Sequence, residues 1–406
     1  MRQPYGSGLH PSPRGVKARA HWLRWKAGRA IKKGLLRPLN RVGLSQAMIE
    51  KVIWAKDRIG QEVKNYRVFH PAQTVKIADT PHEMEFLQTV RAYRTGSLGL
   101  DEVFVCEVSP AMFYPYLGVV ANESFEVFGD SVLLPHRFET SDIYMSFRPR
   151  QVDRRSGPVS SIQRIDSYSF WHWFADCLPQ IITLERYMQG EPLTLLMGDN
   201  LGGFQRETLK LMLPETMQVE FVPAERWIAT DRFILPSYLS GRRSGYIHPG
   251  YYEEIRCRIA KGVGLPELVA KPDLRIYLSR GTAGRRRVLN ESELVQLLER
   301  YGFQTAFPER LSMREQVELF QRAEAIVAPH GGALGGMVFS THAKLLVLYP
   351  EKHPGEYFYT MARSLGLEHY GVTGNWEGGE DSVEDFAVDL NRIEELLAGP
   401  MGLKTC

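Results

Sequence analysis

The rest of the chain is organised around the stretch Ala325-Ile326-Val327-Ala328-Pro329-His330-Gly331-Gly332-Ala333-Leu334-Gly335-Gly336. Its first half is a short apolar run typical of a buried strand, and the glycines that follow let the backbone approach a ligand closely. A helix over Ala333–Ser340 would aim its first free N–H groups, and the positive end of its dipole, above that strand. The sequence therefore predicts a strand, a tight turn and a helix start that fits an anion, most naturally a diphosphate.

Two interpretations of this turn stay open on the sequence alone. Its spacing matches neither G-x-G-x-x-G nor G-x-x-x-x-G-K-[ST], so the glycines would also suit a purely structural turn. His330 stands at the carboxyl end of the strand, where it would donate to phosphate or sugar oxygens, or close the turn as a satisfied polar residue.

The composition is that of a soluble globular chain with room for two domains. The 406 residues are 44% hydrophobic and 24% charged, which is ordinary for such proteins. We find no run of about 18 apolar residues and no apolar segment of the signal-peptide type, so we expect a cytoplasmic protein. The four cysteines are widely separated and form no C-x-x-C pair, which argues against structural zinc and against a disulfide framework.

Positive charge is concentrated in residues 1–60, where lysine and arginine far outnumber Glu50 and Asp57. Residues 1–15 are rich in Gly, Pro and Ser, a composition typical of disorder. Residues 16–40 interleave basic and aromatic side chains, which suits a helix on an anionic membrane face, although a solvated tail or a packed helix would also fit. No nucleic-acid-binding module follows, so nucleic acid is not an expected partner.

An α/β fold in two units follows from the alternation of strands and helices. Strands near 193–197, 219–222 and 233–235 are separated by helical patterns, and a second alternation begins at 251 after a Gly- and Pro-rich connector. The expected organisation has four parts: a basic, partly disordered or amphipathic segment 1–65, an acceptor-side α/β domain 66–240, a Rossmann-like domain 241–382, and a helix with a tail 383–406.

A first candidate pair lies in the aromatic stretch Ser167–Pro179. If this stretch is helical, His172 and Asp176 stand one turn apart on one face, and a hydrogen bond between them would orient a general base. Pro179 has no N–H, so the helix either kinks there or starts near Asp176 with that residue as its N-cap. The alternative is a buried, satisfied histidine beside a capping aspartate.

A second candidate set follows the predicted strand Leu274–Leu278. Ser279, Arg280 and the run Arg285–Arg287 would stand at its carboxyl end, where arginines clamp phosphates bidentately, although a solvated basic loop fits the same residues. Asn290 marks the start of the next helix.

Two further positions belong to later elements. Ser312 and Glu315 form a capping box that opens a helix toward the Ala325 strand. Glu351 follows the predicted strand Lys344–Leu348, where it would accept from ribose hydroxyls or face solvent.

These segments together resemble glycosyltransferase family 61, which includes bacterial capsular polysaccharide biosynthesis proteins. The resemblance covers about residues 160–372. It rests on four motifs: His172-x-x-x-Asp176-x-Leu178-Pro179; Ser279-Arg280 with Arg287, Asn290 and Glu291; Phe303, Pro308-Glu309 and Leu311-Ser312; and Gln316–Phe320, Ala323, His330-Gly331 and Ala333-Leu334.

The resemblance implies a GT-B architecture, with two Rossmann-like domains facing a central cleft. It implies a nucleotide-sugar donor in the C-terminal domain, an acceptor at the N-terminal one, and inversion at the anomeric carbon without a metal or other cofactor. The chain also lacks a D-x-D motif. Inversion requires one base opposite the leaving diphosphate, and the matching positions are Asp176, with His172 as its orienter or as the base itself. The implied donor-binding residues are Ser279, Arg280, Arg287, Asn290, His330, Gly331, Gly332, Ala333, Leu334 and Glu351.

The sequence thus predicts an inverting glycosyltransferase of surface-polysaccharide or glycolipid assembly, peripheral on the inner face of the cell membrane through residues 16–40. Two alternatives remain. One is a nucleotide-sugar epimerase or hydrolase on the same fold, and the other is a non-catalytic nucleotide-sugar-binding subunit of a polysaccharide assembly complex.

Overall fold

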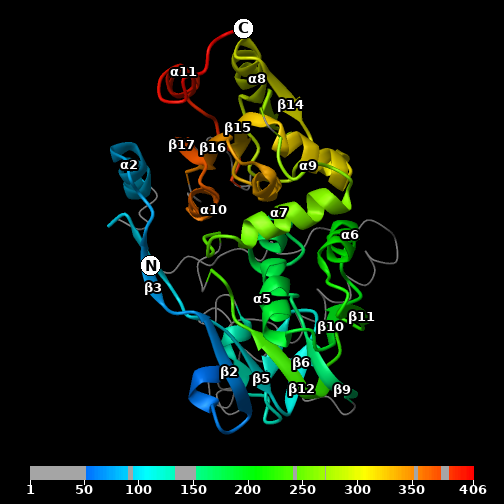
Figure 1. Ribbon diagram of the computed structural model, residues 1–406. Helices are drawn as coiled ribbons and strands as arrows, with labels where there is room; N and C mark the ends of the chain where they lie inside the picture. The colour runs from blue at the N-terminus through cyan, green and yellow to red at the C-terminus, as the bar shows by residue number, and fades with distance from the viewer. Residues whose placement is uncertain are drawn as a thin grey trace, which may run out of the picture.

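The computed structural model describes residues 52–89, 95–132, 152–240, 245–269, 271–351, 355–375 and 384–406. Two large sheets and the helices around them form the α/β fold predicted from the sequence (Figure 1). Residues 16–40, expected to meet a membrane, lie outside the described ranges. Within those ranges, no helix is both long enough and apolar enough to cross a membrane.

The N-terminal part of the chain forms one mixed sheet of ten strands. Strand β12 is central, since β9 pairs with it in parallel while β5 and β6 share its other edge in antiparallel orientation. Strands β10 and β11 continue the parallel part beyond β9. The ten strands are β1 (Val52–Ile53), β2 (Val63–His70), β5 (Val103–Val108), β6 (Ala111–Tyr114), β7 (Val119–Ala121), β8 (Val127–Phe128), β9 (Asp153–Ser160), β10 (Leu193–Gly198), β11 (Met217–Val222) and β12 (Ile228–Pro236).

This sheet begins earlier than the residue 66 at which the sequence analysis placed the N-terminal domain. Strand β1 starts at Val52 and β2 at Val63, and most side chains of β2 are exposed or half-buried. An edge strand of this kind lacks the apolar alternation that marks a half-buried strand. A separate antiparallel pair, β3 (Gln73–Lys76) and β4 (Ser97–Leu100), follows β2.

The C-terminal sheet has five parallel strands in the order β14-β13-β15-β16-β17. The chain runs from β13 to β14 on one side and then crosses back to β15 on the other, so the direction of winding reverses between β13 and β15. Strands β15 and β16 are apolar and almost fully buried, as expected for strands covered on both faces. The strands are β13 (Leu274–Leu278), β14 (Phe303–Ala306), β15 (Ala323–Pro329), β16 (Lys344–Pro350) and β17 (Glu368–Gly374).

The helices cover the sheets and join them. Helix α7 lies between the two sheets in Figure 1, and one buried apolar cluster continues from Leu195 and Ile234 to Ile326 and Leu345. The α-helices are α2 (Pro81–Thr89), α4 (Phe170–His172), α5 (Pro179–Met188), α6 (Gly203–Met212), α7 (Tyr251–Gly262), α8 (Glu291–Arg300), α9 (Met313–Gln321), α10 (Tyr357–Leu365) and α11 (Leu390–Ala398). Short 3₁₀ helices cover Ala55–Arg58, Gly129–Ser131, Pro308–Arg310 and Gly332–Phe339, and a π turn covers Trp173–Cys177.

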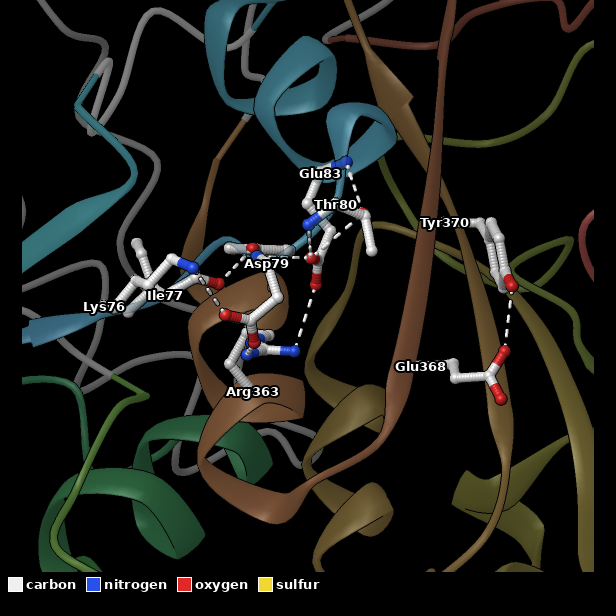
Figure 2. A network of polar contacts seen from close by, with 9 residues as sticks. Lys76, Ile77, Asp79, Thr80, Glu83, Arg363, Glu368 and Tyr370 are labelled. Atoms are coloured by element: carbon white, nitrogen blue, oxygen red, sulfur yellow. Dashed lines mark hydrogen bonds and ion pairs between the residues drawn. The ribbon is translucent and has the colours of Figure 1, made fainter.

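Helix α2 also ties the N-terminal part of the chain to the C-terminal sheet. Figure 2 shows Arg363 of α10 bound to Asp79 and, at 3.1 Å, to Glu83 at the start of α2. Tyr359 donates to the carbonyl of Ile77. The ring of Phe86 lies against Gly371 of β17. These contacts join segments almost three hundred residues apart in sequence, so α2 packs against the C-terminal part of the chain.

The helix after the glycine turn differs from the predicted α-helix over Ala333–Ser340, because the structure has a 3₁₀ helix over Gly332–Phe339. Glycines disfavour the α-helix, and here they allow close packing. A Cβ on Gly336 would stand only 2.0 to 2.5 Å from ring atoms of Phe320 in α9.

We expect Gly336→Ala to lower the free energy of unfolding by about 1–3 kcal/mol, because the added methyl group overpacks a buried aromatic ring. Urea unfolding measures this change. Gly203→Ala is the control, since a Cβ there meets nothing within 4 Å, and it should change stability by less than about 0.5 kcal/mol. Equal stability of Gly336→Ala and the wild type would contradict this packing.

Candidate functional site

The candidate site lies where the winding of the C-terminal sheet reverses. Parallel sheets bind ligands outside the carboxyl ends of their strands at such a point, because the two loops there leave in opposite directions. The loop after β13 begins at Ser279, and the turn after β15 begins at His330. Strands β13 and β15 are paired neighbours, so the two predicted donor-binding segments meet.

Arg280 lies directly on the glycine turn. Its Nη1 atom is 2.1 Å from the point that a Cβ on Gly331 would occupy, so the guanidinium fills the space of a missing side chain. Its Nη2 donates to the carbonyl of Arg285 at 3.1 Å. Burial, followed by the charge of Arg285, lowers the pKa of Arg280. A buried cation of this kind favours an anionic partner.

Arg286 brings a second positive charge to the same place. Its φ of 57° lies in the left-handed region, which reverses the chain and points the side chain inward. The Nη1 atom is 2.5 Å from Nδ1 of His330, and Nε lies 3.7 Å from the Glu384 carboxylate. Burial, and then the charges of Arg280 and Arg285, lower the pKa of Arg286 to about 10. Arg280, Arg286 and His330 form what we call the basic cluster.

Arg287, the member of the run that was predicted to bind the donor, lies outside the basic cluster. Its side chain is half exposed and bound to Asp385 through Nε at 2.9 Å and Nη2 at 2.7 Å. From the sequence, Arg286 was expected at this site only as one member of the run Arg285–Arg287. Nothing in three consecutive arginines indicates which one faces the turn, because the left-handed φ of Arg286 decides this.

Two other predicted donor-side residues bind neighbouring protein groups. Ser279 donates to Glu291 at 2.8 Å, which fixes the start of the loop to α8. Asn290 stands at the N-cap position of α8, but its side chain makes no capping bond there. It exchanges two hydrogen bonds with the main chain of Val388 instead, at 2.9 and 3.0 Å.

The remaining predicted donor-side residues lie along the 3₁₀ helix and at the end of β16. The first bond of the helix runs from the N–H of Leu334 to the carbonyl of Gly331 at 3.1 Å, so the N–H groups of Gly331, Gly332 and Ala333 have no partner inside the helix. Leu334 is buried and packs into the core. Glu351 is exposed directly after β16.

Across from the basic cluster, on the N-terminal side of the site, His172 and Asp176 form the hydrogen-bonded pair that the helical spacing predicts. Nδ1 of His172 is 2.7 Å from Oδ2 of Asp176, and Oδ1 of Asp176 accepts from Ser240 Oγ at 3.4 Å. The exposed fraction is 27% for the His172 side chain and 2% for that of Asp176. The histidine is therefore the member of the pair that a ligand can reach.

Pro179 is accommodated by a π turn, and not by a helix that starts near Asp176. The π turn covers Trp173–Cys177, and α5 begins at Pro179. The N–H of Leu178 bonds to the carbonyl of Trp173 at 2.9 Å, five residues back. This wider turn lets Pro179 open α5 at a position where its missing N–H costs nothing, and such turns are frequent at functional sites.

The charge around His172 favours its protonated form. Burial acts to lower its pKa, but the hydrogen bond and charge of Asp176, with the charge of Asp166, raise it above the ordinary value of 6.5. Asp176 thus orients the ring through Nδ1 and leaves Nε2 as the nitrogen available for proton transfer.

The pair and the basic cluster approach each other through the start of α4. A Cβ on Gly332 would lie 3.6 Å from Ser169 Oγ and 4.0 Å from the main-chain nitrogens of Phe170 and Trp171. The Trp171 ring packs edge-on against Phe358, whose ring also meets His330 at 4.8 Å between centroids.

Tyr168 lies just before α4, near the contact between that helix and the glycine turn, and it was not among the predicted site residues. Burial and the charge of Asp166 raise its pKa to about 12, and the charges of Arg285 and Arg286 oppose this shift. Tyr168 therefore lies within electrostatic reach of both sides. Its position in the aromatic run gave no signal that separates it from its neighbours.

Asp176→Asn should lower the pKa of His172, because the substitution removes the negative charge that favours the imidazolium. Histidine NMR measures the shift. The raised folded-state pKa means that the pair stabilises the fold fully below pH 6.5 and loses this contribution as pH rises through the folded pKa. The stability lost in Asp176→Asn should therefore be larger at pH 5.5 than at pH 8.5, and a loss that grows with pH would contradict the assignment.

The comparison with curated proteins found no match. A family model described as Glycosyltransferase 61 matches residues 170–347. The matched range contains the His172–Asp176 pair, the loop after β13 and the glycine turn, which are the segments that the fold brings together. Residues 170–347 of this chain are therefore similar to glycosyltransferase family 61.

Proposed function

We propose that the chain is an inverting glycosyltransferase of the GT-B type, which moves a sugar from a nucleotide-sugar donor to a saccharide or glycolipid acceptor. The observation that supports it most is the meeting of two partly buried arginines and a buried histidine at the reversal point of the C-terminal sheet. The His172–Asp176 pair, on the other sheet's side of the same contact, supplies the second half of such a site.

The basic cluster is the proposed binding site of the donor diphosphate. Arg280 and Arg286 place positive charge beside the free N–H groups of Gly332 and Ala333, and such donors stabilise the charge that develops on a leaving diphosphate. Because both guanidinium groups are largely buried, water screens them little and the attraction is strong. In this proposal the cations take the part that Mg²⁺ has in metal-dependent transferases.

His172 is the proposed general base, oriented by Asp176. The acceptor hydroxyl attacks the anomeric carbon, its proton passes to Nε2 of His172, and the bond between that carbon and the diphosphate oxygen breaks with its electrons on the leaving group. Attack from the side opposite the diphosphate inverts the configuration. The buried carboxylate of Asp176 stabilises the imidazolium that forms, as in other base–orienter pairs.

The proposed biological setting is the assembly of surface polysaccharide or glycolipid at a cell membrane. Residues 16–40 carry the basic and aromatic pattern that suits the inner face of a cell membrane, where glycolipid and polysaccharide acceptors are assembled. An epimerase or hydrolase would share the donor site but would consume the donor without a saccharide acceptor, and a non-catalytic binding subunit would bind the donor without turnover.

We expect the wild type, given nucleotide sugars and saccharide acceptors, to release nucleoside diphosphate only when an acceptor is present, and to form a product of inverted configuration by NMR. His172→Gln should lower kcat by about 10²–10⁴-fold and leave the dissociation constant of the donor unchanged. The rate of the wild type should fall as pH drops through the raised pKa of His172, because a protonated base accepts no proton.

Arg280→Gln should raise the dissociation constant of the donor, because it removes a positive charge from the proposed diphosphate site. Calorimetry measures this change. Arg322→Gln is the matched control, because this arginine is bound to Asp273 on the surface at 2.8 Å. Donor consumption without an acceptor would favour the epimerase or hydrolase, and donor binding without turnover would favour the binding subunit. Full activity of His172→Gln would reject the proposed base.

A further inference from the structure

Arg164 carries a buried positive charge behind the His172–Asp176 pair. It lies in the segment after β9, outside the part of the chain that matches the family, and only 3% of it is exposed. Its Nη1 donates to the main-chain oxygens of Ser161 at 3.2 Å and Gln163 at 2.9 Å. Burial of an arginine is costly, so a position like this requires compensation by the surroundings.

The acceptors that Arg164 contacts are all uncharged. Besides the two carbonyls, Nη2 donates to the side-chain oxygen of Gln180 at 2.6 Å and to the carbonyl of Pro236 at 3.5 Å. The negative charge of this region belongs to Asp176 and Asp166. The charge of Asp176 raises the pKa of the buried side chains of Cys177 and Tyr238, and the charge of Arg164 lowers it, so Arg164 and Asp176 lie within electrostatic reach of the same two groups.

Two hydrogen-bonded bridges connect Arg164 with Asp176. Gln180 accepts from Arg164 with its oxygen and donates with its nitrogen to the carbonyl of Asp176 at 3.0 Å. The second bridge is the segment after β12, where the Pro236 carbonyl accepts from Arg164 and Ser240 donates to the Asp176 carboxylate. Tyr238, in the middle of this segment, lies under the guanidinium at 5.2 Å.

We propose that Arg164 is a positioning residue for the general base: through Gln180 and residues 236–240 it fixes the Asp176 carboxylate, which in turn orients His172. This inference rests on the proposed function. It explains why a rigid, planar guanidinium with several donors occupies the site, since a lysine ammonium does not bind such an array of acceptors. The π turn at Trp173–Cys177 needs this support, because its wider spacing leaves Asp176 outside regular α-helical bonding.

The charged and titratable groups around the pair come from every neighbouring element. Asp166 lies in the segment before α4, and its charge acts on His172. Cys177 follows Asp176 in the π turn, Tyr238 follows β12, and Tyr252 belongs to α7; the charge of Asp176 acts on all three. Each of the three has a pKa well above its ordinary value, chiefly through burial, so none of these three side chains is ionised near neutral pH.

The test uses the full chain with Arg164→Lys, which keeps the charge but removes the forked donor, and Gln180→Met, which removes one bridge and no charge. Loosening Asp176 should lower the NMR titration midpoint of His172 by about half a unit or more. It should also lower kcat about ten-fold, with the donor dissociation constant unchanged. The His172→Gln spectrum identifies the signal among the eleven histidines.

Arg232→Lys is the matched control, because this arginine of β12 binds Glu107 at 2.8 Å elsewhere in the same sheet. It should leave both the midpoint and kcat at their wild-type values. If either test variant fails to fold, the other decides. An unchanged His172 midpoint in the folded variants would overturn the inference. If the wild type transfers no sugar, the proposed function fails, and the midpoint alone still decides whether Arg164 positions Asp176.

Discussion

The contact between the Arg280 guanidinium and the backbone of Gly331 is the interaction on which the site depends. It exists because β13 and β15 are neighbours although α8, β14 and α9 separate them in sequence. A side chain at residue 331 would occupy the position of the guanidinium. The strand order thus brings an arginine and a glycine together, and the absence of a Cβ lets the guanidinium lie against Gly331 in the turn.

The same turn also joins the two sheets. The glycines that open and continue the 3₁₀ helix allow the start of α4 to pack closely against it, so the His172–Asp176 pair is placed by the packing that places the basic cluster. Arg363 of α10 forms ion pairs with Asp79, before α2, and with Glu83 in α2, which join this helix to the C-terminal part of the chain. The same contacts therefore stabilise the fold and set the geometry of the site. A change at the turn would shift both the basic cluster and the His172–Asp176 pair.

Much of this could be predicted from local patterns. The strand β13 has the predicted bounds, the capping box of Ser312 and Glu315 is present, and the pair at residues 172 and 176 bonds as the helical spacing indicates. Long-range contacts account for the rest. The choice between Arg286 and Arg287 depends on a left-handed φ and on Asp385, almost one hundred residues away. Pro179 required a π turn that helix propensity does not indicate, and the buried bridges of Arg164 join three segments that no local pattern connects.

The most direct test of the proposed site is a crystal structure of the chain with a nucleoside diphosphate. We expect the diphosphate to lie between the Arg280 and Arg286 guanidinium groups, within hydrogen-bond distance of the N–H groups of Gly332 or Ala333. We also expect His172 to face the side away from the leaving oxygen. A diphosphate bound elsewhere on the molecule, with Arg280 still lying on Gly331, would contradict it.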